Sequence, residues 1–493
     1  MNKTALFCDG TEGYVYPPEP KESELVTFRF RTAKDDADRV GLVTSADTYV
    51  MEKECTQGEF DYYTFETRLG EEPFRYCFEV QSGTEKYYYG RCGISREILE
   101  YYNFVVVPGF STPDWAKGAV MYQIFTDRFY NGDKSNDVET NEYYYIGDYS
   151  QRVTNWDKYP ANMGVREFYG GDLQGVMDKL DYLQDLGVEV VYFNPLFVSP
   201  SNHKYDIQDY DYIDPHYGKI VDDGGEVLPN GVTDNSQATK YKKRTTGLKN
   251  LEASNELFIK LVEELHRRGM KVILDGVFNH TGSQSRYFNA DGFYPGVGAA
   301  QSTDSPYFNW FSFHPWPTDY DAWWGIMTLP AVQENESDYR DFIIRGQDSV
   351  VRHWLRAGAS GWRLDVADEL PDDFIAEIRT AMEETAPDSF LLGEVWEDAT
   401  TKFGFDKRRT YLLGKGLDSV MNYPFKNAVL DFVKGKPAEQ AMTEILTICE
   451  HYPAPAINTA LNFLSTHDTE RALTVIADEP ANGRGREWQS GRS

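Results

Sequence analysis

Short runs in which apolar and polar residues alternate fill the chain up to about residue 107. Runs at 25–30, 60–65 and 76–80 follow this pattern, and glycines and charged residues separate them. Alternation with a period of two predicts strands with one buried face, and many such strands in succession are typical of a β-sandwich. We therefore predict an antiparallel β-sandwich domain of immunoglobulin-like or carbohydrate-binding-like type over residues 1–108, with a linker at 108–113.

After the linker, apolar runs alternate with amphipathic helices. One helix is expected to start at Asp172 as N-cap and stop at Gly187, and another to stop at Gly269. Alternating strands and helices indicate a parallel sheet, and no glycine-rich phosphate loop follows any strand, which counts against a nucleotide-binding fold. The predicted strands are residues 120–125, 188–193, 271–275, 361–365, 389–394, 418–423 and 459–466.

Between residues 281 and 335 this alternation stops. The segment is rich in aromatic residues, Gly, Asp and Pro, and it contains Trp310, Trp316, Trp323 and Trp324. A long irregular excursion from a barrel is usually functional. Its tryptophans could either stack on sugar rings or build the small core of the excursion itself.

Three of the predicted strands end in carboxylates. Arg363 and Asp365 are two apart on one strand, so their side chains should lie on one face, while Glu394 and Asp468 end two later strands. Carboxylates gathered at the C-terminal ends of strands are the layout of a barrel active site, and glycoside hydrolysis requires two of them. The alternative is a set of ordinary salt bridges at a barrel rim.

Length and charge narrow the class of protein further. With 493 residues the chain should form two or more domains, and a net charge of -30 argues against nucleic acid and anionic membranes as partners. No signal peptide and no membrane-spanning run are recognisable, so we expect a cytoplasmic protein. The five cysteines favour reduced thiols, although the first four could form one or two disulfides.

Four segments of this chain resemble the hallmark segments of glycoside hydrolase family 13, the α-amylase family, and they occur in the family's order. They are Asp275-Gly276-Val277-Phe278-Asn279-His280, Gly361-Trp362-Arg363-Leu364-Asp365-Val366-Ala367, Gly393-Glu394-Val395-Trp396 and Phe463-Leu464-Ser465-Thr466-His467-Asp468. The resemblance covers roughly residues 115 to 490. Residues 122–129 and 201–206, and the leading sandwich, are similar to the neopullulanase, cyclomaltodextrinase and maltogenic amylase group. The sequence departs from that group at 329–333, where Leu-Pro-Ala-Val-Gln replaces Met-Pro-Lys-Leu-Asn.

The resemblance implies an α/β fold, a (β/α)8-type TIM barrel over 114–493, with 281–335 as the irregular domain B after the third strand. No eighth strand is recognisable after Arg471, whereas family members continue with that strand, its helix and a C-terminal sandwich. We therefore expect a truncated barrel that lacks its last strand and has open edges. Such a chain should be poorly stable and weakly active. A cooperative thermal transition together with robust maltodextrin hydrolysis would contradict this.

The resemblance also implies a retaining two-step mechanism. Asp365 would be the nucleophile, kept ionised by Arg363. Glu394 would be the general acid and then the base, with an apolar wall that favours its protonated form. Asp468 would stabilise the oxocarbenium-like transition state. The remaining predicted substrate contacts are His280 and His467 as donors to sugar hydroxyls, Tyr205 stacked beneath the ring, and Asp275, which orients Arg363.

A loop rich in side-chain oxygens follows the first predicted barrel strand. Such a loop suits Ca²⁺, which takes six to eight oxygen ligands, and related enzymes bind calcium at a matching motif. A solvated acidic loop is the alternative. The predicted ligands are Asn131, Asp133, Asn136, Asp137, the carbonyl of Gly170, and Asp172.

These features predict an α-1,4-glucan hydrolase that acts on maltodextrins, cyclodextrins or pullulan. We expect no organic cofactor, and a homodimer is a possible assembly. The same residues serve transglycosylases and α-glucosidases. A hypothesis from another class is a glucan-binding fragment without catalysis, which an Asp365→Asn comparison would distinguish. A third hypothesis is a metal-dependent barrel enzyme, for which chelation of the metal should abolish activity.

Overall fold

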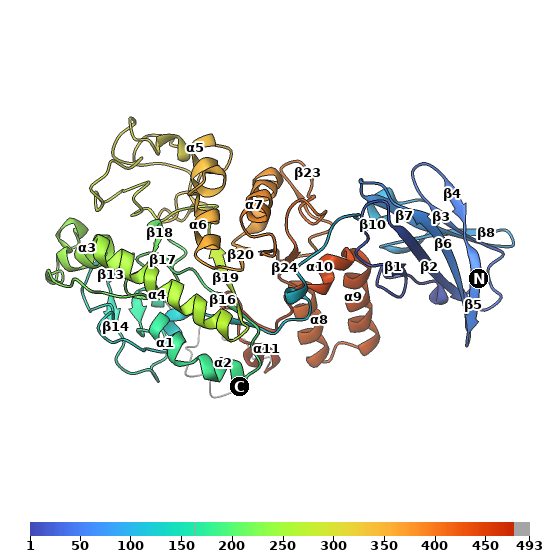
Figure 1. Ribbon diagram of the computed structural model, residues 1–493, viewed down its shortest axis with the longest axis horizontal. Helices are drawn as coiled ribbons and strands as arrows, with labels where there is room; N and C mark the ends of the chain where they lie inside the picture. Colours follow the sequence, from blue (N-terminus) through green and yellow to red (C-terminus); the bar gives the residue numbers. More distant parts are fainter. Residues whose placement is uncertain (162, 478–493) are drawn as a thin grey trace. The chain divides into compact units, whose positions relative to one another are not determined.

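The computed structural model describes residues 1–161 and 163–477 and divides into two compact units (Figure 1). One unit is Met1–Gly118 together with the segment that starts at Val395, and the other is Ala119–Glu394. Each unit is described by itself below.

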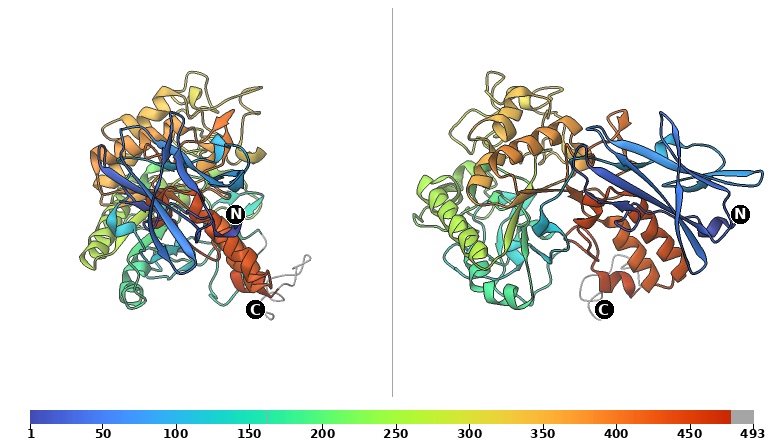
Figure 2. Two further views of the ribbon diagram at one scale, coloured as in Figure 1. Left: turned by 90° about the vertical axis from the view of Figure 1, so that its right-hand side faces the viewer. Right: turned by 45° about the vertical axis from the view of Figure 1, so that its right-hand side comes forward.

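The first part of the first unit is a sandwich of two antiparallel sheets, drawn in blue in Figures 1 and 2. One sheet has the order β1 (Val15–Tyr16), β2 (Leu25–Ala33), β6 (Phe60–Arg68), β5 (Glu52–Gln57). The other has the order β4 (Thr48–Val50), β3 (Arg39–Val43), β7 (Phe74–Ser82), β8 (Glu85–Gly90), β9 (Gly93–Ser95), with β10 (Phe104–Val106) also on β7. Phe30 of β2 stacks on Phe78 of β7 with ring centroids 4.4 Å apart, so the alternating apolar positions meet between the sheets. The predicted β-sandwich is confirmed, and all five cysteines are free thiols.

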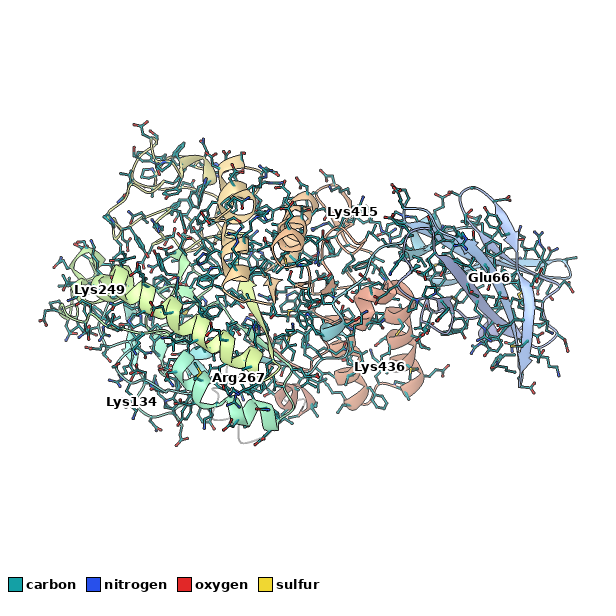
Figure 3. The ribbon with its side chains drawn as sticks, in the orientation of Figure 1. Glu66, Lys134, Lys249, Arg267, Lys415 and Lys436 are labelled. Atoms are coloured by element: carbon teal, nitrogen blue, oxygen red, sulfur yellow. The ribbon has the colours of Figure 1, made fainter. Side chains whose placement is uncertain are left out.

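The later part of this unit is mainly helical. Its elements are β22 (Phe403–Gly404), β23 (Lys407–Arg408), β24 (Ser419–Val420), α8 (Tyr423–Val433), α9 (Ala438–His451), α10 (Ala454–Asn458) and α11 (Ala472–Ile476). Helices α8 and α9 form a hairpin, and Lys436, labelled in Figure 3 at its turn, pairs with Asp431 of α8 and Glu444 of α9 at 2.9 and 2.7 Å.

The strand predicted at 459–466 is wrong for most of its length. Only Leu461 joins a parallel ladder, as a single bridge to Met421. Its amide donates to the Val420 carbonyl at 3.1 Å, and its carbonyl accepts from the Asn422 amide at 2.9 Å. Among the described residues no strand pairs with the other edge of this segment, so nothing extends the ladder. The question of an eighth strand concerns residues from 478 onward as well, which lie outside the described part.

The second unit contains a parallel sheet with strands in sequence order. These are β11 (Met121–Ile124), β16 (Val190–Phe193), β19 (Lys271–Gly276), β20 (Gly361–Leu364) and β21 (Phe390–Gly393). Between successive strands the chain forms α1 (Leu173–Asp178), α2 (Leu180–Asp185), α3 (Thr239–Thr246), α4 (Leu248–Arg267), α5 (Ser337–Arg340), α6 (Val350–Arg356) and α7 (Asp372–Thr385). A parallel sheet with helices in every connection is the curled sheet of a TIM-barrel-type domain, as predicted.

Shorter elements complete the two units. Three small ladders pair β12 (Tyr144–Tyr145) with β13 (Asp148–Tyr149), β14 (Gln151–Arg152) with β15 (Glu167–Phe168), and β17 (Phe197–Val198) with β18 (Asp209–Ile213). A π-helical turn spans Asp341–Arg345. Short 3₁₀ turns lie at Lys3–Ala5, Glu100–Tyr102, Asp114–Ala116, Thr126–Arg128, Gly164–Arg166, Asn235–Gln237, Phe308–Trp310, Trp323–Gly325 and Ala367–Glu369.

Local sequence explains how the helices begin and end. Asp172 caps α1 by accepting a hydrogen bond from the Gly175 amide at 2.6 Å, as predicted. The single helix predicted as far as Gly187 is instead broken at Lys179, between α1 and α2. Helix α4, whose ends are marked by Lys249 and Arg267 in Figure 3, buries one stripe and stops before Gly269, which has φ +81°.

The excursion at 281–335 contains no helix longer than a 3₁₀ turn. Aromatic residues form its core: Phe288 contacts Phe311, Phe313 and Tyr320 with ring centroids 4.6 to 5.7 Å apart. Trp310 is buried in this core, whereas Trp316 and Trp324 are exposed. Trp310 therefore serves the excursion's own packing, which is one of the two alternatives weighed for these tryptophans.

A buried charge network joins three segments of the second unit. His216 Nε2 lies 2.8 Å from Glu142 Oε1, and His216 Nδ1 lies 3.0 Å from Asp214 Oδ1. Lys204 Nζ binds Asp214 at 2.7 Å, and Arg244 Nη1 binds Glu142 at 2.9 Å. Burial alone would lower the pKa of His216, but Glu142 and Asp214 raise it to about 9. The network holds the backbone of Lys204, next to Tyr205, in place.

The charged His216 is expected to make stability depend on pH. Its pKa is raised in the fold, so its contribution is complete below the unfolded value of about 6.5 and is lost as pH rises through about 9. Relative to His216→Gln, the wild type should lose on the order of 3 kcal/mol of unfolding free energy between pH 6 and pH 10. Urea unfolding of both proteins at several pH values between 6 and 10 measures this loss of unfolding free energy. The exposed His314→Gln variant should follow the wild type, and parallel curves for wild type and His216→Gln would refute the prediction.

Candidate active site

The strand ends of β19, β20 and β21 bring polar side chains into register. Asp275 lies opposite Arg363, and the ladder continues past the strands through the amides of Asp365 and Glu394, which donate to the carbonyls of Gly276 and Leu364 at 3.1 and 3.0 Å. Because the strands are parallel and unshifted here, their C-terminal ends form one edge of the sheet.

Arg363 is the centre of this cluster. Its Nη1 donates to Asp275 Oδ1 at 2.8 Å and to Asp365 Oδ1 at 2.9 Å. Its Nη2 lies 2.9 Å from Glu394 Oε2, an ion pair without hydrogen-bond alignment. The guanidinium is completely buried, and the three carboxylates that this one cation holds are at most 10% exposed.

Burial governs the electrostatics of this cluster. It would lower the pKa of Arg363, but Asp275 and Glu394 outweigh it and raise that pKa well above its usual value. Burial raises the pKa of Asp275, against the opposing effects of Arg363 and the Tyr192 hydroxyl. The guanidinium therefore stays charged at any pH at which the protein is folded, and the cluster keeps a fixed cation beside Asp365.

Two tyrosines and a histidine surround Asp275. The hydroxyls of Tyr192 and Tyr205 both donate to Asp275 Oδ2, at 2.7 and 2.8 Å. His280 Nε2 lies 3.1 Å from the Tyr205 carbonyl oxygen, and burial lowers the pKa of His280 to about 4. The ring is therefore neutral at pH 7, and its proton is on Nε2, directed to the backbone. Donation by His280 to a sugar hydroxyl would require this N–H to leave the Tyr205 carbonyl; it stays a prediction, as does stacking of a sugar on Tyr205.

The backbone after Asp365 is strained. Val366 has φ 41° and ψ 48°, a left-handed conformation that a β-branched residue rarely adopts. This conformation directs the Val366 amide to Glu394 Oε2, which it binds at 2.9 Å. Strain of about 1–3 kcal/mol at such a residue is retained where the surrounding fold fixes its conformation. Here the hydrogen bond of the Val366 amide links the strand end that carries Asp365 to the one that carries Glu394.

An aromatic wall extends from His280. The Trp323 ring stacks on His280 with centroids 5.3 Å apart. Glu369 accepts hydrogen bonds from the indoles of Trp323 and Trp324, at 2.9 and 3.0 Å. Trp324 is 80% exposed, so Glu369 fixes an indole face in solvent beside the cluster.

Sequence reasoning missed Tyr192, Val366 and Glu369. Tyr192 carried a signal, because a tyrosine in a buried strand needs a partner for its hydroxyl. Val366 and Glu369 carried none, since a left-handed conformation and a carboxylate between two indoles depend on contacts with distant segments.

His467 and Asp468 belong to the other compact unit. There His467 Nε2 lies 3.1 Å from Asp468 Oδ2, and Trp396 stacks on Tyr423 with centroids 4.4 Å apart. Of the predicted site residues, the structure brings together Asp275, Arg363, Asp365, Glu394, Tyr205 and His280.

The loop predicted to bind calcium forms a tight turn against the start of α1. Asn131 Oδ1 and Asn136 Oδ1 are both buried without a hydrogen-bond donor. Asp137 Oδ1 accepts from Asn131 Nδ2 at 2.6 Å, and a side chain at Gly170 would collide with both of these groups. Asp172 instead uses both oxygens on backbone amides, including those of Gly132 and Asp133.

Unpaired amide oxygens beside a carboxylate are hard oxygen donors, which suit Ca²⁺. The unpaired oxygens of Asn131 and Asn136 therefore fit a cation better than Asp172, whose oxygens cap the helix and close the turn. Asp137 already binds Asn131 through Oδ1 and Arg152 through Oδ2, so a cation there would share this carboxylate with Arg152. Asp133 Oδ1 is also occupied, by the amide and hydroxyl of Ser135 at 3.0 and 2.6 Å.

Family models match most of the chain. The alpha amylase catalytic domain matches residues 123–224 and 252–487, and the alpha amylase N-terminal ig-like domain matches residues 1–107. The chain belongs to the alpha-amylase family.

Individual relatives point to one branch of it. Neopullulanase 2 of Thermoactinomyces vulgaris is 32% identical over 97% of this chain and 74% of its own. A cyclomaltodextrinase structure is similar with a TM-score of 0.65 and 29% identity, over 97% of this chain and 74% of that chain. The amylopullulanase of Thermoanaerobacter thermohydrosulfuricus is 35% identical over 87% of this chain, which spans only 30% of that longer protein. Among the described residues, no helix combines the length and apolarity that crossing a bilayer requires.

Proposed function

We propose that the chain is a retaining α-glucan hydrolase that cleaves α-1,4 bonds in maltodextrins, cyclodextrins or pullulan. One observation carries the proposal: Asp365 and Glu394 lie against the two Nη atoms of the same guanidinium, both at 2.9 Å. Two carboxylates held this closely suit a retaining mechanism, in which they are about 5 Å apart, better than an inverting one, which needs room for a water.

In the first step Asp365 attacks the anomeric carbon while Glu394 gives its proton to the departing glycosidic oxygen. The products are a glycosyl ester of Asp365 and the shortened glucan. In the second step Glu394 removes a proton from water, which attacks the anomeric carbon and frees Asp365. Arg363 keeps Asp365 anionic for the attack through an aligned hydrogen bond from Nη1, whereas its Nη2 faces Glu394 without one, and Asp275 holds Arg363 in position.

The test is the configuration and identity of the first products. Proton NMR during hydrolysis should show the α-anomer first, with slower mutarotation to β. An initial β-anomer would exclude the retaining mechanism. Maltose, maltotriose, cyclodextrin and pullulan supplied separately would distinguish the substrates. Cleavage of maltose with pullulan and cyclodextrin untouched would exclude the neopullulanase-like assignment.

The names of the relatives support these substrates, since they include a neopullulanase and cyclomaltodextrinases. A relative in Bacillus subtilis, 29% identical, is named an intracellular maltogenic amylase, which supports a cytoplasmic location. Homodimer formation stays a prediction, which size-exclusion chromatography would test.

Calcium bound in the 131–137 loop is expected to contribute to stability but not to chemistry. It would satisfy the buried oxygens of Asn131 and Asn136 and would share the Asp137 carboxylate with Arg152. Saturation at about 100 times the dissociation constant is worth about 2.7 kcal/mol, or about 5–10 °C in Tm at the 2–4 °C per kcal/mol of a large domain. EDTA should lower Tm by that amount while activity at 25 °C changes less than about two-fold.

Asn136→Ala should remove the calcium dependence of Tm. The exposed Asn309→Ala, in the same unit, is its control and should retain it. Complete loss of activity on chelation at a temperature where the fold persists would contradict a structural role and favour a metal-dependent reaction.

A further inference from the structure

A small cavity lies inside the first unit, between the sandwich and the segment after Val395. Its volume is about 30 Å³. Four arginines line it, Arg75, Arg91, Arg408 and Arg409, together with Thr400 and His451, and no aspartate or glutamate is among its lining residues. In a chain with 79 acidic and 49 basic side chains, such a gathering of cations is unexpected.

Three of these arginines lack a carboxylate partner among the described residues. The Arg75 side chain makes no hydrogen bond or ion pair there. Arg91 is only 3% exposed, and it donates to the carbonyls of His451 and Tyr101 at 2.8 and 3.2 Å while its Nε has no acceptor. Arg408 donates to the carbonyls of Tyr101 and Thr400, at 2.7 and 2.9 Å.

Asp398, the carboxylate that acts on the pKa of Arg91, is engaged by other groups. Asp398 accepts from the amide and hydroxyl of Thr400, at 2.9 and 2.7 Å, and contacts His451 Nδ1. The positive charges of neighbouring arginines therefore help to lower the pKa values of Arg75 and Arg91. Burial and Arg408 lower the pKa of Arg75, and burial, Arg408 and Arg75 lower that of Arg91 to about 10, even with Asp398 acting against them. Like charges held together in this way are destabilising unless an anion joins them.

We propose that this arginine cavity binds a phosphoryl group, either inorganic phosphate or the phosphate of a phosphorylated sugar. About 30 Å³ is room for roughly two waters, which matches an oxyanion head rather than a whole sugar ring. The planar fork of a guanidinium suits phosphate oxygens, and a dianion satisfies several cations where a carboxylate carries one charge.

A bound phosphoryl group would connect three segments of the unit. Arg75 lies on β7, Arg91 follows β8, and Arg408 belongs to β23. The anion would therefore tie the sandwich to the segment after Val395. This site is independent of the glycosidase reaction proposed above, since none of its residues belongs to the strand-end cluster.

The test is binding of phosphate to the full chain, by titration calorimetry and thermal unfolding, against chloride at equal ionic strength. We expect saturable binding and a rise in Tm. Arg75→Ala should weaken binding at least about ten-fold, because each charge-assisted bond is worth more than the 1.4 kcal/mol of one decade. It should leave the unliganded Tm unchanged or higher, since Arg75 makes no bond in the fold. Arg39→Ala, an exposed sandwich arginine away from the cavity, is the matched control.

The same measurements with glucose 6-phosphate, and with glucose as its unphosphorylated control, distinguish the two possible ligands. Tighter binding of glucose 6-phosphate than of phosphate identifies a phosphorylated sugar as the ligand, and equal affinity identifies inorganic phosphate. No saturable effect of either phosphate compound, or an equal effect in Arg75→Ala and Arg39→Ala, overturns the proposal.

Discussion

Asp365→Asn is expected to lower kcat by about 10⁴-fold or more, because it removes the nucleophile of a two-step reaction. The amide is isosteric and still lies beside Arg363, which keeps its bonds to Asp275 and Glu394. The fold should therefore survive. Initial rates on maltotriose, with circular dichroism to establish folding, measure the effect.

Azide would separate a nucleophile from a merely structural carboxylate. In Asp365→Ala, which leaves the space that the isosteric amide would fill, the small anion can attack the anomeric carbon in place of the missing carboxylate, so azide should restore turnover and give a glycosyl azide of inverted configuration. Asp348→Asn, at an exposed carboxylate, should behave as the wild type. Equal rates for wild type and Asp365→Asn would instead favour the non-catalytic glucan-binding protein.

Arg363→Met is expected to destabilise the protein by about 3–5 kcal/mol, because it leaves buried carboxylates without their cation. Asp275 and Glu394 contact this guanidinium directly, and both are buried. Activity should fall with stability, since Asp365 loses the charge that keeps it anionic. Urea unfolding at pH 7 measures the loss, and the exposed Arg345→Met, which removes a surface pair with Glu377, should cost about 1 kcal/mol or less.

The loss of unfolding free energy in Arg363→Met, called the deficit below, is expected to depend on pH. The pKa of Asp275 is already raised by burial, against the pull of Arg363, and removal of the cation raises it further. A carboxyl whose pKa is raised in the fold contributes stability below its unfolded value, and that stability is lost as pH rises through the folded value. The deficit of Arg363→Met should therefore be smaller at pH 5 than at pH 8, and a deficit that grows towards acid pH would contradict this account.

Much of the fold was predictable because periodicity is a local property. Alternation predicted the sandwich, and apolar runs predicted the strands that carry Arg363 and Glu394. The same reasoning failed at 459–466, where Leu461 alone pairs with a neighbour, and at Lys179, where one helix became two. A strand exists only where another backbone meets it, and no pattern within the segment itself reports that.

The sequence by itself determined which residues can perform the chemistry. Arg363 and Asp365 share a strand face because side chains two apart point the same way, and Glu394 follows the next strand of a parallel sheet. Tertiary structure alone decided how they are joined. Arg363 contacts three carboxylates, and the left-handed conformation of Val366 directs its amide to Glu394. Glu369 accepts hydrogen bonds from two indoles. It also placed Arg75, Arg91 and Arg408 around one cavity. Those contacts link segments far apart in the chain, so their energies depend on distances that only the folded backbone sets.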